Sequence, residues 1–207
     1  MSIQHHPDIS TLMSYSAGSL GEALSAVVIA HIVRCPQCRA DLRRLETLGA
    51  AVFAGEHGVG VGAPPTLPLS DDKSAKRVGE RIPDPLAVML AGGLSSFRWR
   101  WLGPGVHHYR LPLSAGASGD LRLLKIAAGR RMPVHGHGGS ELTLVLDGSY
   151  HDETGRFGPG DVEDVDDATE HQPIADPITG CVCLIASERA ARFKGVLGRL
   201  VQPLTGM

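Results

Sequence analysis

Residues 129–148, GRRMPVHGHGGSELTLVLDG, carry the strongest structural signal in this 207-residue chain. From Glu141 to Asp147 leucine recurs at every second position, and side chains with this period lie on one face of a β-strand. Gly138 and Gly139, just before this segment, are typical of a tight turn. Because His135 and His137 are two positions apart, a strand would place both rings on the same side. The stretch therefore predicts two strand segments joined by a glycine-rich turn.

The period of two continues through the second half of the chain. Residues 181–186 alternate in the same way as residues 142–147. Glycine-rich turns recur between the expected strands, at residues 116–119, 136–139 and 155–160. Short strands separated in this way indicate an all-β sandwich or a small barrel. We therefore expect an antiparallel β-domain over residues 95–195, followed by a C-terminal tail at 196–207.

The first half of the chain has the period of α-helices instead. A short helix is expected from Asp8 to Ala17, since Gly commonly closes a helix and Gly18 follows. Two longer helix faces comprise Leu24, Val27, Val28, His31 and Cys35, and, after Pro36, Cys38, Leu42, Leu45, Leu48 and Val52. Glycine and proline predict an exposed linker at 55–83, and residues 84–94 fit one more helix. The fold class is therefore α + β in two domains, with a small helical domain over 1–94.

Charge and hydropathy exclude several classes of protein. The chain has 20 basic and 22 acidic residues and a net charge of -2, which argues against direct binding of nucleic acid through bulk charge. No apolar run reaches the roughly 18 residues of a membrane span, and the start lacks the pattern of a signal peptide. We expect a cytoplasmic protein with no membrane partner. Its four cysteines are then ligands, packing residues or redox-active thiols rather than structural disulfides.

A first group of metal-ligating residues lies in the helical half. His31-x3-Cys35-x2-Cys38 places one imidazole and two thiolates where they can converge on one ion. A tetrahedral Zn²⁺ site needs four such ligands, and His6 is the expected fourth, with His5 as the competing candidate. Such a closed site holds a small fold together. Packing of these residues in the core is an alternative, whereas redox catalysis is disfavoured because this Cys-x-x-Cys follows a helix rather than a strand.

A second group lies in the β-domain and comprises His135, His137, Glu141 and His171. Three imidazoles and one carboxylate suit a divalent metal; Zn²⁺ is preferred here, with Mn²⁺, Fe²⁺ and Ni²⁺ as alternatives. Four protein ligands leave open positions on a six-coordinate ion, so this site could bind or transform a small molecule.

Two further cysteines, Cys181 and Cys183, share one face of a predicted strand. A disulfide between residues only two apart would be strained. The pair is therefore interpreted as packing residues, or alternatively as oxidisable thiols that face the barrel interior near the metal.

The two groups resemble two known families. His6 with His31-x3-Cys35-x2-Cys38 resembles the zinc-binding anti-sigma fold, and Gly129-x5-His135-x-His137-x3-Glu141-x6-Gly148 resembles the first motif of the cupin family of β-barrels. The second cupin motif is matched in part. The distance from Gly160-Asp161 to His171 is kept, but residues 166–170 replace the usual Pro-x-Gly, which leaves His151 and Glu170 as substitutes for His171.

A zinc anti-sigma motif followed by a cupin barrel resembles the ChrR family of anti-sigma factors. The resemblance implies that the helical domain binds an extracytoplasmic-function sigma factor and blocks its access to RNA polymerase. It also implies that the cupin domain takes part in the response to an oxidative signal such as singlet oxygen or organic peroxide. Self-association through the cupin domain is possible in such a protein.

A different class of function stays open from the residues alone. Some cupins are dioxygenases or isomerases with the same ligand set, and the helical domain would then be a regulatory appendage. A neighbouring gene for an alternative sigma factor would favour regulation, whereas a catabolic operon would favour catalysis.

Overall fold

The computed structural model describes residues 2–56, 93–189 and 192–193. Three helices come first in the chain: α1 (Ile9–Ser16), α2 (Glu22–Ile32) and α3 (Pro36–Glu56). A 3₁₀ turn, η1 (Leu94–Ser96), precedes the strands. The described strands are β1 (Arg100–Gly103), β2 (Val106–Arg110), β3 (Asp120–Ile126), β4 (His135–Gly136), β5 (Glu141–Gly148), β6 (Tyr150–His151), β7 (Arg156–Phe157), β8 (Val162–Val165), β9 (Glu170–His171), β10 (Ile174–Ala175), β11 (Cys181–Ser187) and β12 (Arg192–Phe193).

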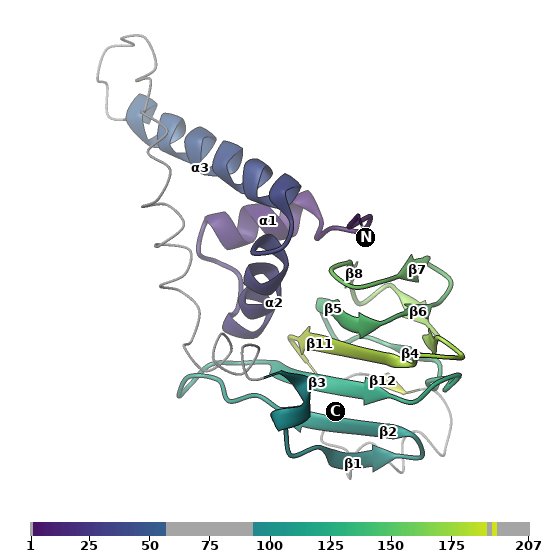
Figure 1. Cartoon of the computed structure of the whole chain (residues 1–207). Coiled ribbons are helices and arrows are strands. Elements are labelled where there is room, and N and C mark those ends of the chain that lie inside the picture. The colour runs from purple at the N-terminus through teal and green to yellow at the C-terminus, as the bar shows by residue number, and fades with distance from the viewer. Residues whose placement is uncertain (1, 57–92, 190–191, 194–207) are drawn as a thin grey trace.

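The strands form one large sheet and two small ones. The large sheet has the order β1-β2-β3-β11-β5-β8, and the small sheets have the orders β10-β6-β7 and β12-β4-β9. All strand pairs described are antiparallel. Among the described residues no ladder joins the three sheets, so the barrel is not closed by continuous hydrogen bonding. The fold class expected from the sequence, a helical unit followed by an antiparallel β-structure, is confirmed (Figure 1).

The large sheet buries both of its faces. On β5 and β11, Leu144 and Leu184 are opposite each other and pack with α2 on one face. Val145 and Cys183 belong to a second apolar cluster, which lines the barrel interior on the other face. The alternation seen in the sequence therefore separates two cores rather than a core from solvent.

Helix α2 lies between the other helices and the sheet. It contacts α1, α3, β5, β11 and β3, and most of its side chains are buried. Val27, Val28 and Ile29 are consecutive residues, and all three are buried. The sequence predicted burial of one face of this helix only. Burial extends around most of the helix, because other elements contact it on nearly every side. Helical unit and barrel share one hydrophobic core.

Helix α3 begins at Pro36, as expected, and continues to Glu56, past the expected start of the linker at 55. Figure 1 shows that its far end extends away from the rest of the molecule. The buried stripe expected along it stops early, since Leu48 is 63% and Val52 is 65% exposed. The rest of the expected linker, most of the helix at 84–94 and the tail at 196–207 lie outside the described residues. In the ranges described, no helix is long and apolar enough to cross a membrane.

Candidate metal centres

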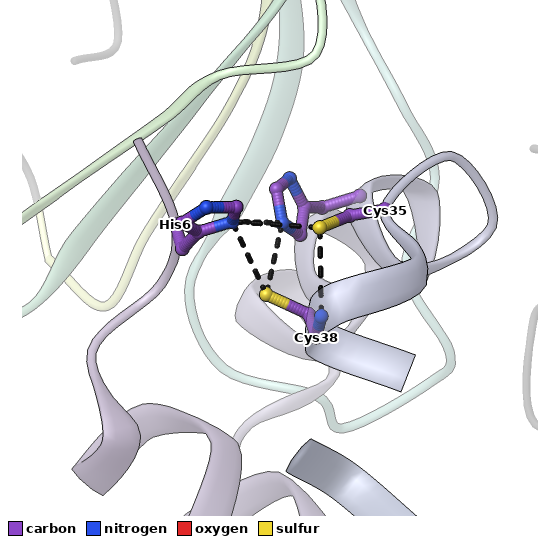
Figure 2. A group of neighbouring side chains, drawn as sticks. His6, Cys35 and Cys38 are labelled. Carbon is purple, nitrogen blue, oxygen red and sulfur yellow. Dashed lines mark hydrogen bonds between the residues drawn. The ribbon is translucent and has the colours of Figure 1, made fainter. Parts of the chain in front are cut away.

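The first group of predicted ligands comes together where the N-terminal segment meets two helices. His6 precedes α1, His31 lies in the last turn of α2, and Cys38 lies in the first turn of α3. Cys35 lies in the turn between α2 and α3, rather than on the face of α2 as the spacing suggested. One ligand atom from each of the four residues lies within 4.8 Å of all the others. Figure 2 shows the side chains of His6, Cys35 and Cys38 directed toward one another.

The separations between these donor atoms are short. His31 Nε2 is 3.2 Å from Cys38 Sγ, and His6 Nδ1 is 3.4 Å from each of the two sulfurs. The two histidine nitrogens are 3.5 Å apart. His5, the competing candidate, instead packs its ring against Phe157 with a centroid distance of 4.5 Å. The structure therefore brings His6, not His5, to the two cysteines.

Burial sets the protonation of this group. His31 is fully buried, and burial lowers its pKa, which keeps the imidazole neutral and able to act as a ligand. Burial, together with the neighbouring Cys35, raises the pKa of Cys38 to about 12. A thiolate is therefore unfavourable here unless a cation neutralises it. Two soft sulfurs and two imidazoles in a buried pocket form a donor set that can hold a metal ion.

The second group of predicted ligands also comes together. His135 on β4 pairs directly with His171 on β9, and Glu141 begins β5. His171 Nε2 lies 3.2 Å from Nε2 of both His135 and His137, and His137 Nδ1 lies 3.3 Å from Glu141 Oε2. One ligand atom of each lies within 4.8 Å of the others. Burial lowers the pKa of His135, which favours the neutral, ligating imidazole.

The alternatives to His171 do not take part in this group. His151 and Glu170 are exposed, and the cluster of donor atoms contains His171 instead of either. The cluster is a mixed nitrogen and oxygen site that can hold a divalent ion.

Comparison with known proteins bears on both groups. A family model described as the ChrR cupin-like domain matches residues 89–191. The anti-sigma-E factor ChrR of Cereibacter sphaeroides is 40% identical over 211 residues, which cover 98% of this chain and 98% of that protein. The chain belongs to the ChrR family of anti-sigma factors. The resemblance predicted from the two motifs is thereby confirmed, and the β-domain is cupin-like.

A solved structure of a ChrR protein has the same fold as this ChrR-family chain. It is the crystal structure of Rhodobacter sphaeroides SigE in complex with the anti-sigma ChrR. The match has a TM-score of 0.70 and 39% sequence identity, and it covers 90% of this chain and 99% of that chain. The likeness therefore includes the helical unit as well as the cupin-like domain.

Two acidic residues that the sequence did not single out support the second group in this ChrR-family chain. His171 Nδ1 is 2.8 Å from Asp152 Oδ2 and 3.2 Å from Glu163 Oε1, and the Tyr150 hydroxyl donates to Glu163 Oε2 at 2.7 Å. Burial alone would lower the pKa of His171, but the two carboxylates outweigh it and raise that pKa to about 10. The carboxylates keep Nδ1 protonated and direct Nε2 toward the other three residues of the group, and a bound cation would displace the proton from Nε2.

Neither of these two residues had a clear signal in the sequence. Glu163 lies in strand β8, whose sequence Val-Glu-Asp-Val places it beside Asp164, so no pattern marks its carboxylate as the buried one. Asp152 lies in a turn after β6, and no period marks it. Its contact with His171 becomes visible only in three dimensions.

A cavity of about 270 Å³ opens beside the second group. Its walls include three of the four predicted ligands, His135, Glu141 and His171, together with Cys183. The pKa of Cys183 is raised mainly by the hydrogen bond with Cys181 and secondly by burial, so this thiol is neutral. Cys181 packs in the apolar cluster of the barrel interior. Both interpretations of the cysteine pair thus have a structural basis, packing for Cys181 and proximity to the ligands for Cys183.

Proposed function

We propose that this protein is an anti-sigma factor that sequesters an extracytoplasmic-function sigma factor from RNA polymerase. The observation that carries the proposal is the full-length likeness to ChrR, including a ChrR chain solved together with SigE. The similarity to ChrR includes the helical unit, which is the part of the chain to which we assign sigma binding. The net charge of -2 is compatible with control of transcription through a protein partner rather than through DNA.

The surface that would meet the sigma factor is formed by exposed apolar side chains of the helices. Leu48 and Val52 are four residues apart on α3 and therefore lie on one face, and Ile9 and Met13 have the same relation on α1. Exposed apolar faces of this kind are typical of partner-binding surfaces. We assign sigma binding to these two faces.

We propose Zn²⁺ as the ion of the first group, bound by His6, His31, Cys35 and Cys38. Zn–N bonds of about 2.0 Å and Zn–S bonds of about 2.3 Å give a tetrahedron whose edges are about 3.3–3.8 Å long. The donor separations of 3.2–3.5 Å are close to these edges. Two thiolates would balance the dication, and the ion would fix the N-terminal segment, α2 and α3 relative to one another.

We propose a divalent ion, with Zn²⁺ preferred over Mn²⁺, Fe²⁺ and Ni²⁺, for His135, His137, Glu141 and His171. The adjoining cavity would give a small oxidant access to the ion and to Cys183. In this proposal the barrel responds to an oxidative signal, such as singlet oxygen or an organic peroxide, and the helical unit then releases its partner. The support for this signal is the family resemblance. The regulatory likeness favours this role over that of a cupin metalloenzyme.

The test is reconstitution with a sigma factor. The full chain is co-expressed with the extracytoplasmic-function sigma factor encoded beside it, the complex is isolated, and transcription from a sigma-dependent promoter is measured with and without the chain. We expect a stable complex and loss of transcription. A chain that binds no such sigma factor would refute the proposal.

A further inference from the structure

A single carboxylate of the barrel holds the N-terminal segment that leads into the first metal group. Asp161 Oδ1 accepts hydrogen bonds from the backbone amides of Gln4 at 2.7 Å and His5 at 3.0 Å. Its other oxygen, Oδ2, accepts from the Gly158 amide at 2.8 Å. The His5 carbonyl in turn accepts from the Val162 amide at 3.1 Å. The residue next in the chain after these contacts is His6, so its position depends on them.

The same turn also holds a second member of the first metal group. The Nδ1–H of His31 donates to the Gly160 carbonyl at 2.9 Å, which directs Nε2 toward the cysteines. Gly160 has a φ of +95°, and a Cβ there would lie 2.8 Å from the Ile3 side chain. Only glycine therefore allows both this turn and the close approach of the N-terminal segment.

The turn is anchored to a strand that carries a member of the second metal group. Val145 on β5 accepts from the Gly160 amide at 2.9 Å and donates to the Asp161 carbonyl at 3.0 Å. Glu141 begins the same strand, four residues earlier. A short chain of backbone contacts thus connects Glu141, the turn and the two histidines of the first group.

We infer that the turn at residues 158–161 is a clasp by which the barrel positions His6 and His31, and that Asp161 is the positioning residue on which retention of zinc in the helical unit depends. The inference rests on the proposed zinc binding. Without the clasp, the segment at residues 2–6 would keep fewer contacts with the barrel. Metal binding would then have to offset more of the conformational entropy that this segment loses on ordering, which would weaken the site. Through the clasp, a change at the barrel strand reaches the zinc ligands directly.

The experiment compares zinc release from full-length variants. Zinc-loaded protein is mixed with excess 4-(2-pyridylazo)resorcinol, and the rate of zinc transfer is followed by absorbance. Asp161→Ala leaves three amides without their charged acceptor, and we expect zinc release to be about tenfold faster or more. Hydrogen–deuterium exchange at residues 4–6 should rise in parallel. Asp147→Ala removes an exposed carboxylate from β5 and serves as the matched control, with both values unchanged.

A second variant approaches the clasp from the opposite side. Gln4→Pro deletes one amide donor to Asp161 and leaves the barrel intact, and we again expect faster zinc release; Ser2→Pro is its control. If Asp161→Ala also loses the barrel metal, its faster zinc release could come from damage to the barrel. The Gln4→Pro variant, whose barrel is intact, then tests the clasp. Zinc release at the wild-type rate in Gln4→Pro would overturn the inference. A wild-type protein that binds no zinc would refute the proposed metal site, whereas zinc binding with no effect of either variant would refute the clasp alone.

Discussion

Cys35 and Cys38 show how burial and charge act together on single residues. Both thiols are buried, and burial, with the contribution of Cys35, raises the pKa of Cys38 to about 12. Without a cation Cys38 would therefore be a neutral thiol, whereas a bound dication would hold it as a thiolate. Metal binding at this site thus releases protons and is favoured at higher pH.

Replacement of the two cysteines tests this residue pair. We expect the double variant Cys35→Ser, Cys38→Ser to lose one zinc per chain in elemental analysis and to lose sigma inhibition, because two neutral hydroxyls cannot balance the dication. Cys181→Ala with Cys183→Ala is the matched control and should keep that zinc. A Cys35→Ser, Cys38→Ser protein that still inhibits the sigma factor would contradict the assignment.

Asp152 makes a similar case for the barrel site. Its carboxylate lies 2.8 Å from His171 Nδ1, opposite the nitrogen that faces the other ligands. We expect Asp152→Asn to weaken binding of Zn²⁺ by the barrel roughly 10–100-fold, the usual effect of losing such support, in a competition titration with a chelator. Asp167→Asn, at an exposed position, should bind as the wild type does. Equal affinities of Asp152→Asn and wild type would show that Glu163 alone suffices.

Helix α3 has two halves with different surroundings. Its first half buries Cys38 and Leu42, whereas Leu48 and Val52 are exposed further along. A buried stripe and an exposed stripe have the same period of 3.6, so sequence alone cannot distinguish a face that packs within the chain from one left for a partner.

The exposed half of α3 carries a prediction about binding. We expect Leu48→Asp with Val52→Asp to weaken sigma binding at least tenfold in a titration, since two charges would enter an apolar contact. Helix content by circular dichroism should stay unchanged, because both side chains are exposed in the free protein. Ile178→Asp places a charge at an 87% exposed apolar residue of the barrel and should leave affinity unaltered. Wild-type affinity of the α3 variant for the sigma factor would show that the interface does not include Leu48 and Val52.

The whole molecule is joined by a shared core as well as by the clasp. Leu184 on β11 is fully buried in the cluster that also contains the side chains of α2. Further hydrogen bonds cross the same boundary, from Asp8 and Thr11 to the Asp164 carboxylate. Such contacts predict that helical unit and barrel unfold together.

Unfolding of the metal-loaded chain measures this coupling. We expect one transition in urea, with the same midpoint by circular dichroism of the helices and by tryptophan fluorescence of the barrel. Leu184→Ala should lower the free energy of unfolding by about 2–5 kcal/mol and shift both signals equally. Two separate midpoints would mean that the units fold independently.

The three described helices, strands β5 and β11 and both groups of candidate ligands could be predicted from patterns in the sequence. The spacings His31-x3-Cys35-x2-Cys38 and His135-x-His137-x3-Glu141 bring donors together through the geometry of a turn or a strand, and the periods of 2 and 3.6 separated the β-domain from the helices. The all-round burial of α2 and the exposure of Leu48 were mispredicted, since periodicity reports a face but not what covers it.

Only the tertiary structure shows which residues position the candidate ligands of each site. Asp161 holds the amide of Gln4 across 157 positions of sequence, and Asp152 meets His171 across 19. No local period encodes such pairs, because they form only when the large sheet brings its turns against the helices and against the small sheets. Spacing along the chain thus indicates the candidate ligands, and the packing of distant segments determines which residues orient them.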